Sequence, residues 1–253
     1  MKKLITLVLM MLVIGTYAQK TDLGIVNTVR PKKGQKVAVE TAYKLHVSKF
    51  HKTADQKVTV YEIMSGPNAG CFHLVEGGKS FADFDKTRPD AAAHALDLDK
   101  TFYPLLEETM NGVYRFMDTL SLHPNVQAEA FVVTVRHLKT TLDQTVYRRE
   151  LSRGVKINNK LKGAFIESLS TAYYEQLWDG TDQVAVLVRG LKDGFKSLET
   201  NYYGPPAPGN AFREEYEKTY GFAAYDERVK ILDNAIEKTE QYIMRLRKDL
   251  GTP

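Results

Sequence analysis

The sequence predicts an α+β fold made of two similar halves that pack sheet to sheet. Two observations indicate this fold. Short segments rich in β-branched residues alternate with amphipathic segments, and three groups of residues recur in the same order in both halves of the chain. Hydrophobic residues make up 43% of the 253 residues and charged residues 26%, as is usual for folded domains. This composition excludes a wholly disordered, collagen-like or polytopic membrane chain.

The first segment has the pattern of an export signal. Lys2 and Lys3 precede an apolar run over residues 4–15, and Thr16-Tyr17-Ala18 follows it. A positive start, an apolar core and small residues at the end are the three parts of a secretory signal. The run is shorter than the roughly 20 residues of a membrane-spanning helix. We expect a signal peptide over residues 1–18 and a periplasmic or secreted protein with no membrane span after cleavage; a membrane anchor is the alternative.

Charge and cysteine content restrict the partners and the source of stability. The chain has 35 basic and 31 acidic residues, so removal of Lys2 and Lys3 leaves 33 against 31, a net charge of +2. So small a charge gives no strong attraction for polyanions, and we expect no nucleic-acid partner. Cys71 is the only cysteine, so no disulfide can form within the chain. The fold must therefore depend on its hydrophobic core.

Internal similarity is the most informative feature of the sequence. The frame Val-x-Thr-Val-Arg occurs at residues 26–30 and again, 106 positions later, at residues 132–136. Tyr61-Glu62 matches Tyr174-Glu175, and Leu-Val-x-Gly-x-Lys occurs at residues 74–79 and 187–192, both at a spacing of 113. Because the order is kept, we predict a tandem duplication. The two halves are then residues 19–125 and 126–253.

The first half predicts a strand, a helix, a hairpin and a second helix. The strand covers residues 24–30 and is stopped by Pro31. The first helix covers residues 35–52, where apolar residues recur at helical spacing. The hairpin has strands over residues 58–64 and 71–76. The second helix is expected over residues 103–119, with an apolar stripe of Leu106, Met110, Val113 and Met117.

The second half predicts the same order. It has a strand over residues 131–138, a helix over 142–161 and a hairpin of residues 172–178 and 183–189 that turns at Asp179-Gly180. A surface loop follows over residues 202–209, and a last helix over 225–250. Each half is then β-α-β-β-α, one strand short of the split βαββαβ, or ferredoxin-like, unit. The missing strand has a weak candidate near residues 122–128 in the first half and none in the second.

This pattern resembles the dimeric α+β barrel superfamily, which includes antibiotic-biosynthesis monooxygenase-like and NIPSNAP-like domains. The resemblance depends on unit length, element order, the duplication and the hairpin in which Tyr61-Glu62 and Ser65-Gly66 are followed by Gly70 and Val75. It implies two tandem ferredoxin-like halves that form one pseudo-dimeric barrel. Relatives of this kind include cofactor-independent oxygenases, haem-degrading enzymes and chlorite-dismutase-like haem proteins. None of their ligand or catalytic patterns can be placed in this sequence.

Motifs that would carry a known chemistry are missing from the sequence. There is no phosphate-binding glycine loop, no Gly-x-Ser-x-Gly elbow, and neither a His-Glu-x-x-His motif nor paired cysteines. His46 and His51 are five residues apart, which is poor spacing for one face of a helix. We therefore predict no metal site, and haem is the one cofactor that the resemblance leaves open.

Five residues are candidates for ligand binding. His73 shares a strand face with Cys71 and Val75, so it is either a general base or a haem or metal ligand in a central space, or a structural histidine. Arg30 and Arg136 occupy matching positions of the two halves and either hold an anionic ligand or form salt bridges. Tyr61 and Tyr174 either line a pocket for a small organic ligand or pack within the sheets.

These features favour an exported protein that binds a small molecule or has a structural role, without a catalytic signature. One alternative is a cofactor-independent or haem-dependent monooxygenase-like enzyme. The other is a scaffold that docks a partner through its C-terminal helix. We expect a small-molecule ligand and either a monomer or a homodimer.

Overall fold

The computed structural model describes residues 22–122, 127–161, 171–178, 183–201 and 210–252. The expected signal peptide, the turn at residues 179–180 and the loop at residues 202–209 lie outside the described residues. None of the helices in the described ranges is long and apolar enough to cross a membrane.

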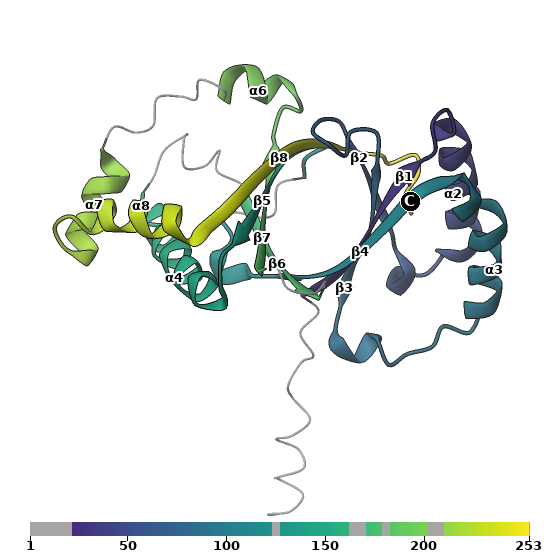
Figure 1. Cartoon of the computed structure of the whole chain (residues 1–253), viewed down its shortest axis with the longest axis horizontal. Coiled ribbons are helices and arrows are strands. Elements are labelled where there is room, and N and C mark those ends of the chain that lie inside the picture. The colour runs from purple at the N-terminus through teal and green to yellow at the C-terminus, as the bar shows by residue number, and fades with distance from the viewer. Residues whose placement is uncertain (1–21, 123–126, 162–170, 179–182, 202–209, 253) are drawn as a thin grey trace, which may run out of the picture.

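Eight antiparallel strands close into a barrel at the centre of the molecule (Figure 1). The order around the barrel is β1-β3-β2-β8-β5-β7-β6-β4. The strands are β1 (Leu23–Pro31), β2 (Thr59–Ile63), β3 (Phe72–Lys79), β4 (Leu106–Phe116), β5 (Ala130–Leu138), β6 (Thr171–Trp178), β7 (Gln183–Leu191) and β8 (Ile236–Leu246).

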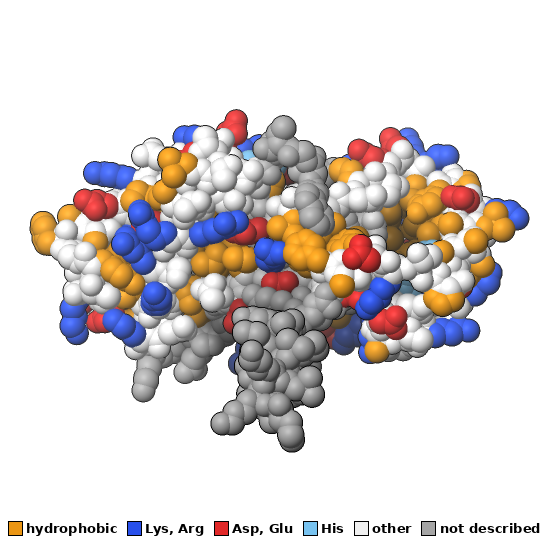
Figure 2. Space-filling model, turned by 90° about the horizontal axis from the view of Figure 1, so that it is seen from below, with side chains coloured by type: hydrophobic (Ala, Val, Ile, Leu, Met, Phe, Trp, Pro, Cys, Tyr) orange, Lys and Arg blue, Asp and Glu red, His pale blue; other side chains and the backbone are white. Residues whose placement is uncertain are grey.

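The helices lie outside the barrel, in two groups on opposite sides (Figure 1). The group of the first half is α2 (Lys36–Phe50) and α3 (Ala91–Thr101); the group of the second half is α4 (Thr141–Asn158), α7 (Ala211–Tyr220) and α8 (Ala224–Ala235), and α6 (Lys196–Asn201) follows β7. Figure 2 shows basic and acidic side chains intermixed over one face. Hydrophobic side chains gather on the α2–α3 side of that face.

Each helix group buries an apolar stripe against the outer face of the barrel. In the first half, Val39, Tyr43 and Val47 of α2 pack on Val29 and Phe72 of the strands. In the second half, Tyr147 of α4 packs with Tyr173, Ala185 and Ala235, and all four are nearly or fully buried. Because apolar residues alternate along the strands, the opposite strand positions point into the barrel.

The two halves have the same strand order. The first half is β4-β1-β3-β2 and the second is β8-β5-β7-β6, and the pairs β2–β8 and β4–β6 join them. Each half is therefore a complete βαββαβ unit, with β1 and β5 in the same place. The predicted α+β class, the first strand of each half and both hairpins are confirmed.

The prediction that each half lacks a fourth strand is wrong. Residues 106–116, expected within a helix, form β4, which pairs along its whole length with β1. Of the helix predicted over 225–250, residues 224–235 are α8 and residues 236–246 are β8, which pairs with β5. The helix that precedes β4 is α3, in a segment to which no element had been assigned.

The physical reason is that both segments suit a strand once partners are present. Gly112 sits in the middle of β4, where it weakens a helix, and Thr109, Val113 and Tyr114 favour a strand. The helical spacing of apolar residues there is incidental. Backbone pairing with two neighbouring strands outweighs this local pattern, as tertiary contacts often do for propensity.

One pair of positions predicted to be equivalent is offset by one residue. Thr28 points into the barrel, where its hydroxyl oxygen lies 2.8 Å from Nδ1 of His73. Thr134 points outwards, and its hydroxyl accepts a hydrogen bond from Nε2 of Gln241 at 3.1 Å. Successive strand residues point to opposite faces, so Val135, next to Thr134, points into the barrel as Thr28 does. Val135 is therefore the counterpart of Thr28.

Candidate functional site

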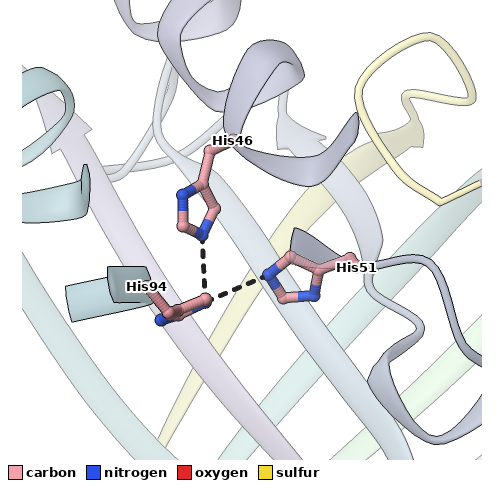
Figure 3. Close-up of side chains that lie close together, drawn as sticks. All are labelled: His46, His51 and His94. Atoms are coloured by element: carbon pink, nitrogen blue, oxygen red, sulfur yellow. Dashed lines mark hydrogen bonds between the residues drawn. The ribbon is translucent and has the colours of Figure 1, made fainter. Parts of the chain in front are cut away.

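Three histidines from two helices converge beneath the helical layer of the first half (Figure 3). His46 lies on the buried face of α2, and His51 is the residue that caps the C-terminal end of the same helix. His94 lies on α3 and approaches both from the other side. His46 and His51 are buried and His94 is half-buried. We refer to these three residues as the histidine cluster.

The hydrogen bonds around the histidine cluster fix where two of its protons lie. Nδ1 of His46 is 2.8 Å from a carboxylate oxygen of Asp97, and Nδ1 of His51 is 2.7 Å from the backbone carbonyl oxygen of Gln56. Both partners accept, so each Nδ1 carries the proton and donates. In neutral rings the Nε2 atoms of His46 and His51 then each carry a lone pair, and both atoms lie within contact distance of Nε2 of His94 (Figure 3).

Nε2 of His94 cannot satisfy both lone pairs well. It lies 3.0 Å from Nε2 of His46 and 3.3 Å from Nε2 of His51. If it carries a proton, that proton makes one good hydrogen bond; if it carries none, three lone pairs meet. The arrangement therefore offers concentrated electron density that suits a cation.

The histidines are held in the neutral form that a metal requires. Burial lowers the pKa of His46 and of His51, although hydrogen bonds to Asp97 and Gln56 act in the opposite direction. Burial, followed by the positive charge of Arg88, lowers the pKa of His94 to about 4. The three rings are thus uncharged near neutral pH, each with a proton on one nitrogen and a lone pair on the other.

The geometry of the histidine cluster fits a zinc ion. The ligand atoms all lie within 4.8 Å of one another. In tetrahedral zinc, with Zn–N distances of about 2.0–2.1 Å, neighbouring nitrogens are about 3.3 Å apart. The two separations that involve His94, 3.0 Å to His46 and 3.3 Å to His51, are close to that value. The acceptors on the two Nδ1 atoms are the outer contacts that typically orient zinc-bound histidines.

The histidine cluster lies in the wall of a pocket of about 400 Å³ between the helices and the outer face of the sheet. The sheet contributes Asn27 and Asn111, and the helical layer contributes Tyr43, Leu98 and Phe102. In the second half, Tyr147 and Tyr173 are fully buried in the helix–sheet core instead. A metal at the cluster would therefore be reached through this pocket.

Sequence reasoning missed the histidine cluster for two reasons. It placed His46 and His51 on one continuous helix, whereas α2 ends at Phe50 and His51 leaves the helical path, with φ −111° and ψ 61°. It also assigned no element to the segment that carries His94. The long alanine-rich run Ala91-Ala92-Ala93-His94-Ala95 favours a helix and was the available signal.

Asp97 gives a first prediction, because it orients His46 without contacting the bound ion. Its carboxylate accepts from Nδ1 of His46 and from Nζ of Lys49. We expect Asp97→Asn to weaken zinc binding about 10- to 100-fold, as loss of an outer contact usually does. Competition with a chelating dye measures this. Asp83→Asn, which alters an exposed hydrogen-bond cluster elsewhere, is the control, and equal affinities for both variants would contradict the role given to Asp97.

His73 points into the barrel, as the strand alternation allowed. Its Nδ1 lies 2.8 Å from the hydroxyl of Thr28, and its Nε2 lies 3.0 Å from the hydroxyl of Tyr242. Burial lowers its pKa to about 4. The ring is thus neutral and both nitrogens have protein partners, which is the arrangement of a structural histidine as much as of a ligand-binding one.

Tyr61 and Tyr174 also point into the barrel, from β2 and β6. The Tyr61 ring packs edge-on against Phe131 with a centroid distance of 5.5 Å, and Tyr174 packs on Phe116 at 5.5 Å. Burial raises the pKa of both phenols. The two tyrosines and His73 therefore share the barrel interior, although the pocket beside the histidine cluster includes none of them.

The structure does not bring Arg30 and Arg136 to matching positions. Arg30 is on the inward-facing side of β1, and its guanidinium donates to Asn68 and Glu108. Arg136 is on the outer side of β5, where it donates to the hydroxyl of Tyr147. The predicted equivalence is wrong because of the one-residue offset between β1 and β5. The two arginines therefore lie on opposite faces of the barrel wall.

Comparison with known proteins supports the architecture. No protein-family model matches the chain, and no curated protein matches it significantly. Among solved structures, it is similar to a candidate monooxygenase from Lactobacillus acidophilus, with a TM-score of 0.54 and 7% identity over 90% of this chain and 93% of that one. It is also similar to an anthrone oxidase-like protein, with a TM-score of 0.53 and 11% identity over 90% and 92% of the two chains. A candidate chlorite dismutase gives a TM-score of 0.50 and 10% identity, over 90% and 96%.

The protein has an α+β fold with a closed eight-stranded barrel, as these structures do. At these identities the likeness shows the fold alone, and fold does not determine function in such superfolds. The α+β barrel expected from the sequence resemblance is confirmed at this level.

Proposed function

We propose that this protein binds a divalent transition metal, zinc in the first place, through His46, His51 and His94. The observation that carries the proposal is the convergence of two fixed Nε2 lone pairs on a third imidazole nitrogen. Imidazole nitrogens suit zinc, and three of them with one open position form the ligand set of catalytic rather than structural zinc sites. The protein is then a metal-dependent binding protein or enzyme whose site is the pocket beside the histidine cluster.

A metal titration tests the proposal. We expect the chelator-treated wild-type protein to take up one zinc ion per chain in equilibrium dialysis. His94→Gln should lose this site, because it removes one ligand on a helix that has no fully buried residue. His137→Gln is the matched control, since His137 contacts Glu240 on β8 instead. Equal zinc uptake by His94→Gln and His137→Gln would refute the proposal.

An oxygenase-type activity inside the barrel is the second candidate. It is supported by the fold likeness to a candidate monooxygenase and an anthrone oxidase-like protein. The buried chain of Thr28, His73 and Tyr242 could orient an aromatic substrate there. Since both ring nitrogens of His73 already have protein partners, a cofactor-independent reaction fits these residues better than haem held by His73.

Oxygen uptake tests the second candidate. If the barrel interior is catalytic, the wild-type protein consumes oxygen in the presence of an anthrone, and His73→Gln and Tyr242→Phe lose most of that activity. His94→Gln should keep it, because the histidine cluster lies outside the barrel. Absence of oxygen uptake, or equal rates for wild type and His73→Gln, would contradict this candidate. A Soret band that depends on His73 would favour the haem-dependent form.

We also propose export and tandem duplication. Export is supported by the pattern of residues 1–18. An intact mass equal to that of a chain that begins at Gln19 would establish cleavage of the signal peptide. Duplication is supported by the matching strand orders and by the recurring residues at a spacing of 113. A relative that consists of a single half would test it: its sequence should align with both halves of this chain at this spacing.

A further inference from the structure

The pocket beside the histidine cluster has the properties of a ligand site. Its volume of about 400 Å³ lies within the range of small-molecule sites, roughly 300–1,000 Å³. The three histidines occupy one part of its wall; the rest is mostly aromatic and aliphatic side chains with two amides, a threonine and one carboxylate. Hydrophobic walls with a few fixed polar groups are the usual composition of such sites.

A metal at the histidine cluster would have a coordination position for that ligand. Zinc in proteins is most often four-coordinate, and the cluster supplies three nitrogens. The carboxylate of Asp97 accepts hydrogen bonds from His46 and Lys49, so it orients the metal-binding ring of His46 and does not bind the metal itself. The fourth position is left to water or to a donor atom that enters through the pocket.

The pocket wall indicates the chemical class of the ligand. Tyr43, Phe102 and Tyr103 present aromatic surface, and Asn27, Thr109 and Asn111 on the sheet present hydrogen-bonding groups. Among the described lining residues there is no Lys or Arg, and Glu76 is the single carboxylate. A multiply charged anion such as phosphate would lack the guanidinium or ammonium donors that usually bind it.

We propose that the open metal position takes a small aromatic ligand that coordinates through its own oxygen atoms and stacks on the wall near Tyr103. This inference rests on the proposed metal site. The metal holds the oxygen donor, and the aromatic wall gives the preference for a ring, because aromatic pairs add to the affinity beyond area burial. Asn111 and Thr109 face the ligand from the sheet.

Cobalt(II) makes the site visible, because its absorption spectrum reports coordination number. Cobalt-loaded protein is titrated with benzohydroxamate, with acetohydroxamate, which lacks the ring, and with inorganic phosphate. We expect benzohydroxamate to change the spectrum and to bind at least about tenfold more tightly than acetohydroxamate, which corresponds to about 1.4 kcal/mol. Phosphate should leave the spectrum unchanged.

Two variants separate the pocket from the metal. Tyr103 is 45% exposed, so Tyr103→Ala should fold normally, keep cobalt and lose most of the tenfold preference. Asn111→Phe, also at an exposed position, should fill the pocket and block both hydroxamates while cobalt still binds. Failure of wild-type protein to bind cobalt would refute the proposed function itself. Cobalt binding with no hydroxamate effect, or equal affinity for both hydroxamates, would overturn the ligand inference alone.

Discussion

We expect saturating zinc to raise the melting temperature of the wild-type protein by about 5–10 °C. A ligand present at 100 times its dissociation constant stabilises the native state by about 2.7 kcal/mol. In a chain of this size, 1 kcal/mol corresponds to roughly 2–4 °C. The stabilised element is α3, which has no fully buried residue and is tied to α2 partly through His94. Differential scanning fluorimetry of chelator-treated protein, with and without zinc, measures the shift.

The shift must depend on the histidine cluster. In His94→Gln the melting temperature without metal should stay close to that of the wild type, because His94 is only half-buried, but zinc should no longer raise it. In His137→Gln, whose histidine pairs with Glu240, the zinc shift should be unchanged. A zinc shift of the same size in His94→Gln would show that the metal stabilises the protein from somewhere else.

We expect Glu62→Gln to lower the free energy of unfolding, measured in urea, by about 3 kcal/mol. Glu62 is 4% exposed on β2 and accepts from Lys36, from Arg245 at 2.7 Å and from Arg247 at 3.1 Å. These contacts join β2 to α2 and to the end of β8, beside the β2–β8 pair that closes the barrel. Removing one partner of a buried ion pair leaves the others uncompensated and typically costs 3–5 kcal/mol; the lower end applies because Lys36 and Arg245 are partly exposed.

The effect of Glu62 should depend on pH in a defined direction. Burial alone would raise its pKa, but hydrogen bonds from Lys36, Arg245 and Arg247 outweigh burial and hold the pKa at about 2, against an ordinary value of 4.5. Because the folded pKa is the lower one, the stabilisation is complete above the ordinary value and is lost as the pH falls towards 2. The difference between wild type and Glu62→Gln should therefore shrink between pH 6 and pH 3.

Glu108→Gln is the control for Glu62. Glu108 pairs with Arg30 at 3.3 Å, but half of its side chain is exposed, and exposed pairs contribute about 0–1 kcal/mol. If Glu62→Gln unfolds at the same urea concentration as Glu108→Gln, the ion-pair network around Glu62 does not help to hold the barrel closed.

The first three strands and the first helix of each half could be predicted from the sequence because local patterns determine them. Pro31 ends the first strand, and the glycine-rich turn between β2 and β3 marks the first hairpin. The fourth strands were missed because their apolar residues happen to fit a helical stripe. A direct comparison of the two segments, Leu106-Glu-Glu-Thr and Ile236-Glu-Lys-Thr, would have found them, since both begin a strand at a spacing of 130.

The candidate site was harder to predict because its residues meet only through tertiary structure. His46 and His94 are 48 positions apart, and neither lies in a metal-binding motif. Strand alternation, which is a local property, placed His73 on one face with Cys71 and Val75, but which face points into the barrel is set by tertiary structure. The placement of Arg136 depended on the register between the halves, where an error of one residue reverses the face.

The X-ray absorption spectrum of the zinc-loaded protein at the zinc edge tests the metal centre most directly. We expect a first shell of three imidazole nitrogens and one oxygen at about 2.0–2.1 Å, with the outer scattering of three histidine rings. A shell of oxygen atoms without imidazole scattering would contradict it, because zinc would then be bound away from His46, His51 and His94.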